Sequence, residues 1–134
     1  MQSLADLALP HTAAVLIEAL ADGNSDVRWI ATRALGELTG ADVVGALIPM
    51  LTDEDNEVGR IAAEGLGRQA DRRAVPHLIA AMRESYPMLR ESAAAALGQL
   101  ADERAIPALH DMLDDDNRQV RQSAQRALNC FTVS

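Results

Sequence analysis

The residues best suited to metal binding or catalysis are three histidines and one cysteine: His11, His77, His110 and Cys130. No two histidines stand three or four residues apart and none neighbours the cysteine, so the spacing of a zinc site is missing. The sequence also has no glycine-rich phosphate loop and no nucleophile beside a recognisable base. These residues predict a protein that is not an enzyme and that holds no metal and no cofactor.

Two acidic runs, Asp53 to Glu57 and Asp114 to Asn117, suggest calcium binding as an alternative. Both lack the alternating ligands, the central glycine and the distal glutamate of an EF-hand loop. Asp and Asn accept hydrogen bonds from the free N–H groups at a helix start, where negative charge is also favourable. We therefore interpret both runs as helix-capping turns.

A third kind of chemistry is non-covalent binding, for which the only tryptophan, Trp29, is the first candidate. Arginines follow it at Arg33 and, in the next helix, at Arg60. Tryptophan and arginine are enriched in the few interface residues that contribute most of the binding free energy. What this group can bind depends on the elements that position it.

Those elements repeat every 31 residues without a gap. Leucine recurs at this spacing in the row Leu35, Leu66, Leu97 and Leu128, and alanine does so in a second row. The further apolar rows are Leu16, Leu47, Leu78 and Leu109; Leu20, Leu51, Met82 and Leu113; and Val27, Val58, Leu89 and Val120. Agreement in so many rows predicts repeated units at 10–40, 41–71, 72–102 and 103–134.

Each unit has the apolar spacing of two helices joined by a polar turn. A Leu-Gly pair near the end of three second helices is consistent with a helix end or with close packing, and we favour close packing because the apolar spacing continues beyond it. Pro49 lies late in a first helix, where it predicts a kink or an early helix end.

One helix pair cannot bury its apolar face, so the units must stack as an all-α, right-handed solenoid of four helix pairs. The segments Ala74 to Ile79, Ala93 to Gly98 and Ala105 to Arg121 resemble the short HEAT-like repeats named after phycobilisome lyases. The resemblance implies that the second helices line a concave face where partners dock. Deoxyhypusine hydroxylases have similar repeats and hold two irons with His-Glu pairs, but no matching position here is His-Glu.

On this face the units differ from one another, whereas the core rows hardly change. We predict a protein-binding surface there, formed by Trp29, Arg33, Arg60, Glu64, Arg68 and Glu91. The alternative is purely structural: Trp29 shields Leu4 and Leu7, and the pairs Arg33–Glu64 and Glu37–Arg68 are ion pairs between units.

The ends of the stack carry their own predictions. Because Leu4 and Leu7 lie one period before Leu35 and Leu38, residues 1–9 are predicted to form a half-repeat with a lone second helix. His110, Gln125 and Asn129 replace apolar or small residues in the last unit, as expected of a terminal cap. A monomer is favoured, and a dimer through Phe131 and Val133 is the alternative.

The overall charge bears on which classes of function are possible. The chain has 134 residues with 12 basic side chains, all arginine, against 20 acidic ones, giving a net charge of −8. This balance opposes nucleic-acid binding, and no apolar run is long enough for a membrane span. A single cysteine and no signal peptide favour the cytoplasm.

The sequence therefore predicts a non-enzymatic scaffold that binds a protein or peptide through the face of its second helices. The alternative, which follows from the family resemblance, is a bilin lyase-like subunit or a pigment-protein chaperone.

Overall fold

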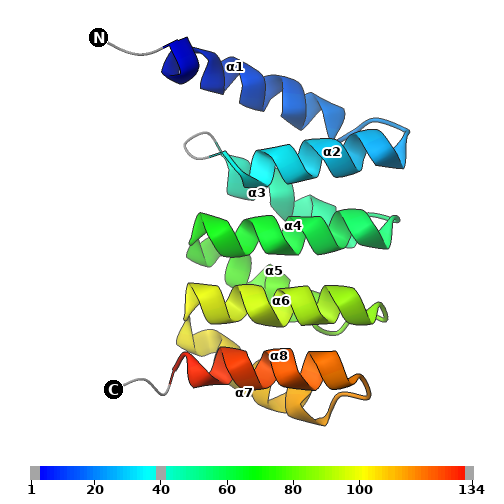
Figure 1. Cartoon of the computed structure of the whole chain (residues 1–134), viewed down its shortest axis with the longest axis vertical. Helices are drawn as coiled ribbons and strands as arrows, with labels where there is room; N and C mark the ends of the chain where they lie inside the picture. The colour runs from blue at the N-terminus through cyan, green and yellow to red at the C-terminus, as the bar shows by residue number, and fades with distance from the viewer. Residues whose placement is uncertain (1–3, 39–41, 132–134) are drawn as a thin grey trace.

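Helices account for all the regular secondary structure in the computed structural model, which describes residues 4–38 and 42–131, with side chains from residue 12 onward. The predicted all-α solenoid is confirmed (Figure 1). The α-helices are α1 Leu4–Ala19, α2 Ser25–Gly36, α3 Val43–Leu47, α4 Asn56–Gln69, α5 Val75–Ala81, α6 Pro87–Leu100, α7 Ile106–Asp111 and α8 Arg118–Asn129. The 3-10 helices are η1 Ile48–Thr52, η2 Arg72–Ala74, η3 Glu103–Ala105 and η4 Met112–Asp114.

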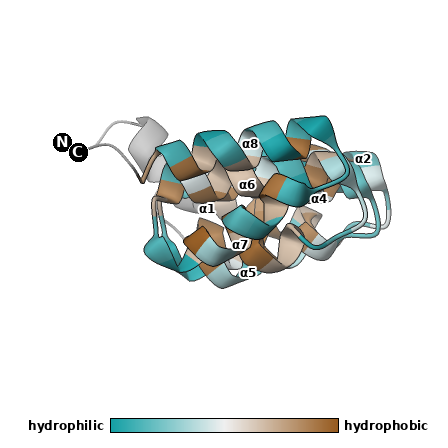
Figure 2. Ribbon diagram, turned by 90° about the horizontal axis from the view of Figure 1, so that it is seen from below, coloured by the Kyte–Doolittle hydropathy of each residue, from teal (hydrophilic) through white to brown (hydrophobic). Residues whose placement is uncertain are grey.

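The second helices α2, α4, α6 and α8 stack side by side as one layer, and α3, α5 and α7 lie behind them (Figure 1). Apolar residues gather between the two layers, and hydrophilic residues cover the outer surfaces and the turns (Figure 2). The repeated rows are buried as predicted: Leu35, Leu66 and Leu97 are fully buried. Leu16 and Leu113 are half-buried, and Val27 is 36% exposed, because α2 is the first helix in the stack of second helices.

The acidic turns cap helices, as predicted from their residue types. The side chains of Asn24, Asp55 and Asn117 accept hydrogen bonds from backbone N–H groups in the first turns of α2, α4 and α8. The start of α6 has no side-chain cap but has Pro87 in its first turn, where a missing N–H group leaves no bond unmade.

Close packing at the Leu-Gly pairs is also confirmed. A Cβ added to Gly36 would lie 3.0 Å from the Cα of Gly65 in α4, and one added to Gly98 would lie 2.9 Å from the Cα of Ala127 in α8. Helices α4 and α6 continue past their glycines, whereas α2 ends at Gly36. These glycines therefore let the backbones of neighbouring second helices approach closely.

Pro49 ends its α-helix early, as predicted. Helix α3 stops at Leu47, and the chain continues as the 3-10 helix η1, with Pro49 in its first turn. There its missing N–H group and its fixed φ disturb the hydrogen bonding least.

The prediction of a separate half-repeat helix before residue 10 is wrong, because α1 runs without a break from Leu4 to Ala19. The segment that joins the two predicted helices lacks the Gly, Asn and Asp turn found between α1 and α2. Its alanines and leucines are strong helix formers, so one helix continues through Pro10. The predicted shielding of Trp29 by Leu4 and Leu7 involves side chains outside the described part of the chain.

Two buried ion pairs link successive repeats, and neither was predicted from the sequence. Arg28 in α2 contacts Asp53 at 2.9 Å, and Arg90 in α6 contacts Asp115 at the same distance. In both pairs the side chains are at least 86% buried. At the equivalent place in α4 stands Gly59, whose added Cβ would lie 2.9 Å from the carbonyl oxygen of Leu51.

The last helix presents a polar side to solvent, as the predicted cap requires. Gln125 and Asn129 are exposed, and the amide of Gln125 donates a hydrogen bond to the side chain of Asn129 at 3.0 Å. Phe131 is half-buried, and Val133 lies outside the described residues.

Among the described helices, none has the length and apolar character needed to cross a membrane.

Candidate binding surface on the second helices

The stacked second helices place equivalent side chains in rows across one face of the molecule. We call this the second-helix face and define it by three rows. The first row is Trp29, Arg60, Glu91 and Gln122; the middle row is Arg33, Glu64, Ala95 and Arg126; and the last row is Glu37, Arg68, Gln99 and Cys130. All twelve side chains are exposed or half-buried. The 31-residue repeat thus sets the rows, and the identity of each residue sets the chemistry.

The N-terminal part of the face is a hollow of about 350 Å³ between α2 and α4. Its lining includes Trp29, Arg33, Arg60, Glu64 and Arg68. Five of the six residues predicted from sequence therefore lie together around one depression. Glu37 and Ile61 complete the lining.

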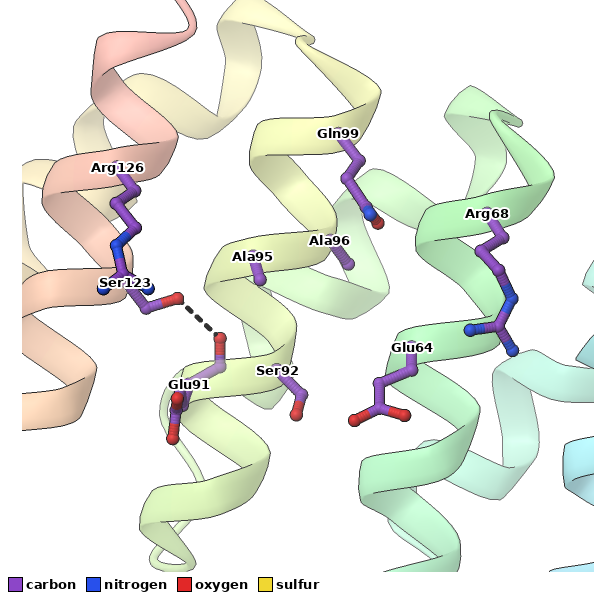
Figure 3. A pocket seen from close by; sticks show the side chains of 9 residues that line it. All are labelled: Glu64, Arg68, Glu91, Ser92, Ala95, Ala96, Gln99, Ser123 and Arg126. Atoms are coloured by element: carbon purple, nitrogen blue, oxygen red, sulfur yellow. Dashed lines mark hydrogen bonds between the residues drawn. The ribbon is translucent and has the colours of Figure 1, made fainter.

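A second hollow, of about 260 Å³, lies over α6 and shares Glu64 and Arg68 with the first. Glu91, the sixth predicted residue, lines it together with Arg126 of α8. In Figure 3 small side chains of α6 form its floor, and the Ser123 hydroxyl donates a hydrogen bond to the backbone carbonyl of Glu91. The two hollows therefore adjoin each other along the face, with Glu64 and Arg68 between them.

Sequence reasoning missed several residues of the second hollow. The lining residues that were not predicted are Ser92, Ala95, Ala96, Gln99, Ser123 and Arg126. The sequence does contain one sign of this hollow. Position 95 is alanine, whereas two of the other three units carry arginine at the equivalent position and one carries glutamate. A short side chain in a row of long ones leaves a space over its own helix.

Arg60 is held by two carboxylates of its own helix. Its guanidinium contacts Glu57 at 2.9 Å and Glu64 at 2.8 Å. The hydrogen bonds from Arg60 and from the Tyr86 hydroxyl hold the pKa of Glu57 below its usual value. Arg60 is therefore held in place within α4, and because one guanidinium faces two carboxylates, this group as a whole keeps one negative charge.

The ion pairs between units that the structural alternative predicts are not formed. Neither Arg33 with Glu64 nor Glu37 with Arg68 forms an ion pair. Glu64 pairs with Arg60, and Arg68 donates a hydrogen bond to the backbone carbonyl of Gly36 at 3.5 Å. Neighbours four apart on one helix are closer than residues on adjacent helices, which explains the pairing within α4. Arg33 instead lies over the Trp29 ring, 5.6 Å from its centroid.

Within the described residues, no three His, Cys, Asp or Glu side chains gather in a way that could hold a metal ion. Cys130 is exposed. The groups that this face presents are an aromatic ring, guanidinium groups, carboxylates and the small side chains of α6.

The model of HEAT repeats matches residues 1–64 and 44–129, which together span most of the chain. The chain belongs to the HEAT repeat family. No curated protein sequence matches this HEAT repeat protein at a significant level.

Solved structures with the same architecture include natural and designed repeat proteins. Human deoxyhypusine hydroxylase in complex with glycerol is 32% identical with a TM-score of 0.78, and the CpcE–CpcF complex of phycocyanin lyase from Nostoc sp. is 28% identical with a TM-score of 0.81. Each match covers 89% of this chain, but only 43% and 53% of the respective neighbour. A designed armadillo repeat protein in complex with the peptide (KR)4 is 20% identical over 87% of this chain and 62% of its own length, with a TM-score of 0.70, so it shares the fold.

Proposed function

We propose that this HEAT repeat protein is a non-enzymatic scaffold that binds a protein or peptide segment through its second-helix face. The observation that carries the proposal is the pair of adjoining hollows across α2, α4 and α6, which together are lined by all six residues predicted from sequence. Its long charged side chains vary from unit to unit, while the core rows beneath them are nearly constant. Exposed rows that differ between units over a constant core support a role in recognition.

Partner capture from a lysate of the source cells, with mass-spectrometric identification, tests the proposal. We expect Trp29→Ala combined with Arg68→Glu to abolish capture without lowering the melting temperature, since Arg68 is exposed and belongs to no ion pair among the described residues. Arg60→Glu is a poorer choice because it would place a third carboxylate between Glu57 and Glu64.

The matched control is Val15→Ala combined with Arg83→Glu, which makes the same types of change at exposed positions away from the face. The control is expected to capture the partner as the wild type does. Capture that survives the face variant, or that both variants lose equally, would refute binding through this face.

The similarity to the CpcE–CpcF complex of phycocyanin lyase supports a second candidate, a bilin lyase-like subunit or pigment-protein chaperone. It predicts a change in visible absorbance when bilin is added to the protein together with a candidate second subunit. A flat titration under these conditions would count against this candidate.

A further inference from the structure

The side of α2 that faces away from α4 has the residues of an internal repeat interface but no second helix on it. In α4 the corresponding side carries Val58, Ile61 and Gly65, and Gly65 lies against the backbone of α2. Val58 and Ile61 are at most 7% exposed there. Their equivalents in α2 are Val27, which is 36% exposed, and Ile30, which is 59% exposed. Helix α1 contacts α2 but leaves these two apolar side chains in water.

The turn before α2 carries one half of an ion pair that is complete elsewhere in the stack. Asp53 and Asp115, at equivalent positions of later repeats, each accept two hydrogen bonds from the arginine of the preceding second helix, at 2.9 and 3.1 Å. The Asp22 carboxylate accepts the same local hydrogen bond as that of Asp53, from the backbone N–H two residues on, at 2.8 Å. Asp22 is exposed, and no arginine among the described side chains lies within 4 Å of its carboxylate.

The interior of the stack shows which kind of helix covers such a surface. Two second helices turn the same three kinds of residue toward the next helix: Arg28, Thr32 and Gly36 in α2, and Arg90, Ala94 and Gly98 in α6. The arginine reaches the aspartate of the next turn, and the small residues four and eight positions later let the two backbones approach closely. An unpaired carboxylate beside exposed apolar side chains therefore favours a helix with this pattern.

The last helix of a second copy lacks part of this pattern. Arg121 in α8 is equivalent to Arg28, and its guanidinium likewise donates a hydrogen bond to the backbone carbonyl six residues earlier. Gln125 and Asn129, however, stand where α6 has an alanine and a glycine. Even a single added Cβ at Gly98 would lie 2.9 Å from the backbone of the next helix, so the longer amide side chains hold a neighbouring helix away.

We propose that the exposed side of α2 docks an amphipathic helix of a partner protein, in which an arginine is followed by a small residue four positions later and by a glycine eight positions later. The arginine pairs with Asp22, and the small residues lie against Val27 and Ile30. The docked helix runs parallel to α2, because in the stack the arginine near the start of one second helix reaches the turn before the next. This surface is separate from the second-helix face, so the inference goes beyond the proposed function.

The test uses a variant of the chain itself as the helix donor. Gln125→Ala and Asn129→Gly give α8 the pattern of α6 after Arg121. The donor also carries Asp22→Lys and Ile30→Glu, which block its own docking surface, because head-to-tail contacts between identical copies otherwise extend into fibres. The acceptor is the wild-type chain, and the control donor keeps Gln125 and Asn129. Isothermal titration calorimetry measures the affinity, and sedimentation velocity measures the mass of the complex.

We expect the donor and the acceptor to form a one-to-one complex and the control donor not to bind. Asp22→Ala in the acceptor should weaken binding roughly tenfold or more, since it leaves the donor arginine without its carboxylate. Ile30→Glu in the acceptor should abolish binding, because it places a charge in an apolar contact. Met88→Glu, at an exposed apolar position on α6, is the matched control and should leave the affinity unchanged.

Circular dichroism verifies that each variant is folded. If the fourfold donor does not fold, the variant with only Gln125→Ala and Asn129→Gly replaces it, and its mass should then increase with concentration. No complex at concentrations up to about 1 mM, or a complex that survives both Asp22→Ala and Ile30→Glu in the acceptor, would overturn the inference. Equal binding by the control donor would overturn the required pattern of small residues. None of these variants changes the six predicted residues of the second-helix face, so the proposed function is tested separately.

Discussion

Gly98→Ala tests whether close backbone contact holds the repeats together. Gly98 lies inside α6, and an added Cβ would meet the Cα of Ala127 at 2.9 Å and its Cβ at 3.0 Å. Both atoms are fixed to the backbone of α8 and are not the ends of a flexible side chain. Helices α6 and α8 must therefore separate to accept the methyl group.

Two opposing effects set the size of the change. Alanine stabilises a helix interior by about 0.5–1 kcal/mol relative to glycine. Overpacking a tight contact costs about 1–3 kcal/mol. The net result should be a loss of about 1–2 kcal/mol in the free energy of unfolding, which corresponds to a fall of about 3–10 °C in melting temperature for a chain of this size.

Equilibrium urea denaturation followed by far-ultraviolet circular dichroism measures this change. Gly23→Ala is the matched control, because an added Cβ there has no heavy atom within 4 Å. It should leave stability unchanged or raise it by up to about 1 kcal/mol through the unfolded state. A Gly98→Ala midpoint equal to or above that of the wild type would show that helix propensity outweighs the contact, and would refute the reasoning.

Three further predictions concern charged groups. Hydrogen bonds from Arg104 hold the pKa of Asp102 at about 2, so its stabilising contribution should be complete above about pH 4 and lost as the pH falls toward 2; Asp102→Asn should flatten this part of an acid-unfolding curve. Asp53→Ala should lower the urea midpoint markedly, because it leaves the buried guanidinium of Arg28 without its carboxylate. The hydrogen bond to Glu57 raises the pKa of Tyr86, the only tyrosine, so Glu57→Gln should move its titration, followed by ultraviolet absorbance, toward the ordinary value.

Each of these three predictions has a control variant or an outcome that would contradict it. Glu54→Ala is matched to Asp53→Ala, since the side chain of Glu54 is 90% exposed and should be dispensable. An equal loss of stability in the two variants would contradict a special role for the buried pair. An acid-unfolding curve that Asp102→Asn does not alter, or a tyrosine titration that Glu57→Gln leaves in place, would contradict the other two predictions.

The second helices could be predicted from sequence because all four have apolar residues at helical spacing, three begin at a capping residue and three contain a Leu-Gly pair. The first helices were harder to predict: the α-helix breaks at Pro49, but α1 continues through Pro10, so one helix formed where two were expected. The equal spacing of the apolar rows also predicted that their members would be equally buried. Val27 is nevertheless exposed, because it lies at one end of the stack.

The positions of the face residues were predictable for the same reason, since the repeat places them in rows. Their pairing was not, because it depends on side-chain conformation. Arg60 reaches along its own helix to Glu57 and Glu64, although the 31-residue spacing suggested contacts between helices. The hollow over Ala95 likewise depends on how far its neighbours extend, which spacing alone does not determine.

The two ends of the solenoid differ in polarity, so an additional repeat is accommodated more easily at one end than at the other. On α2, Val27 and Ile30 are exposed, whereas the equivalent Ile61 in α4 is buried. A further 31-residue unit inserted before α2 would cover residues that already have interior character. One appended after α8 would bury the amides of Gln125 and Asn129, which are bonded to each other. Repeat duplication, in evolution or in protein engineering, is therefore expected to be tolerated on the N-terminal side of α2 and to need compensating substitutions after α8.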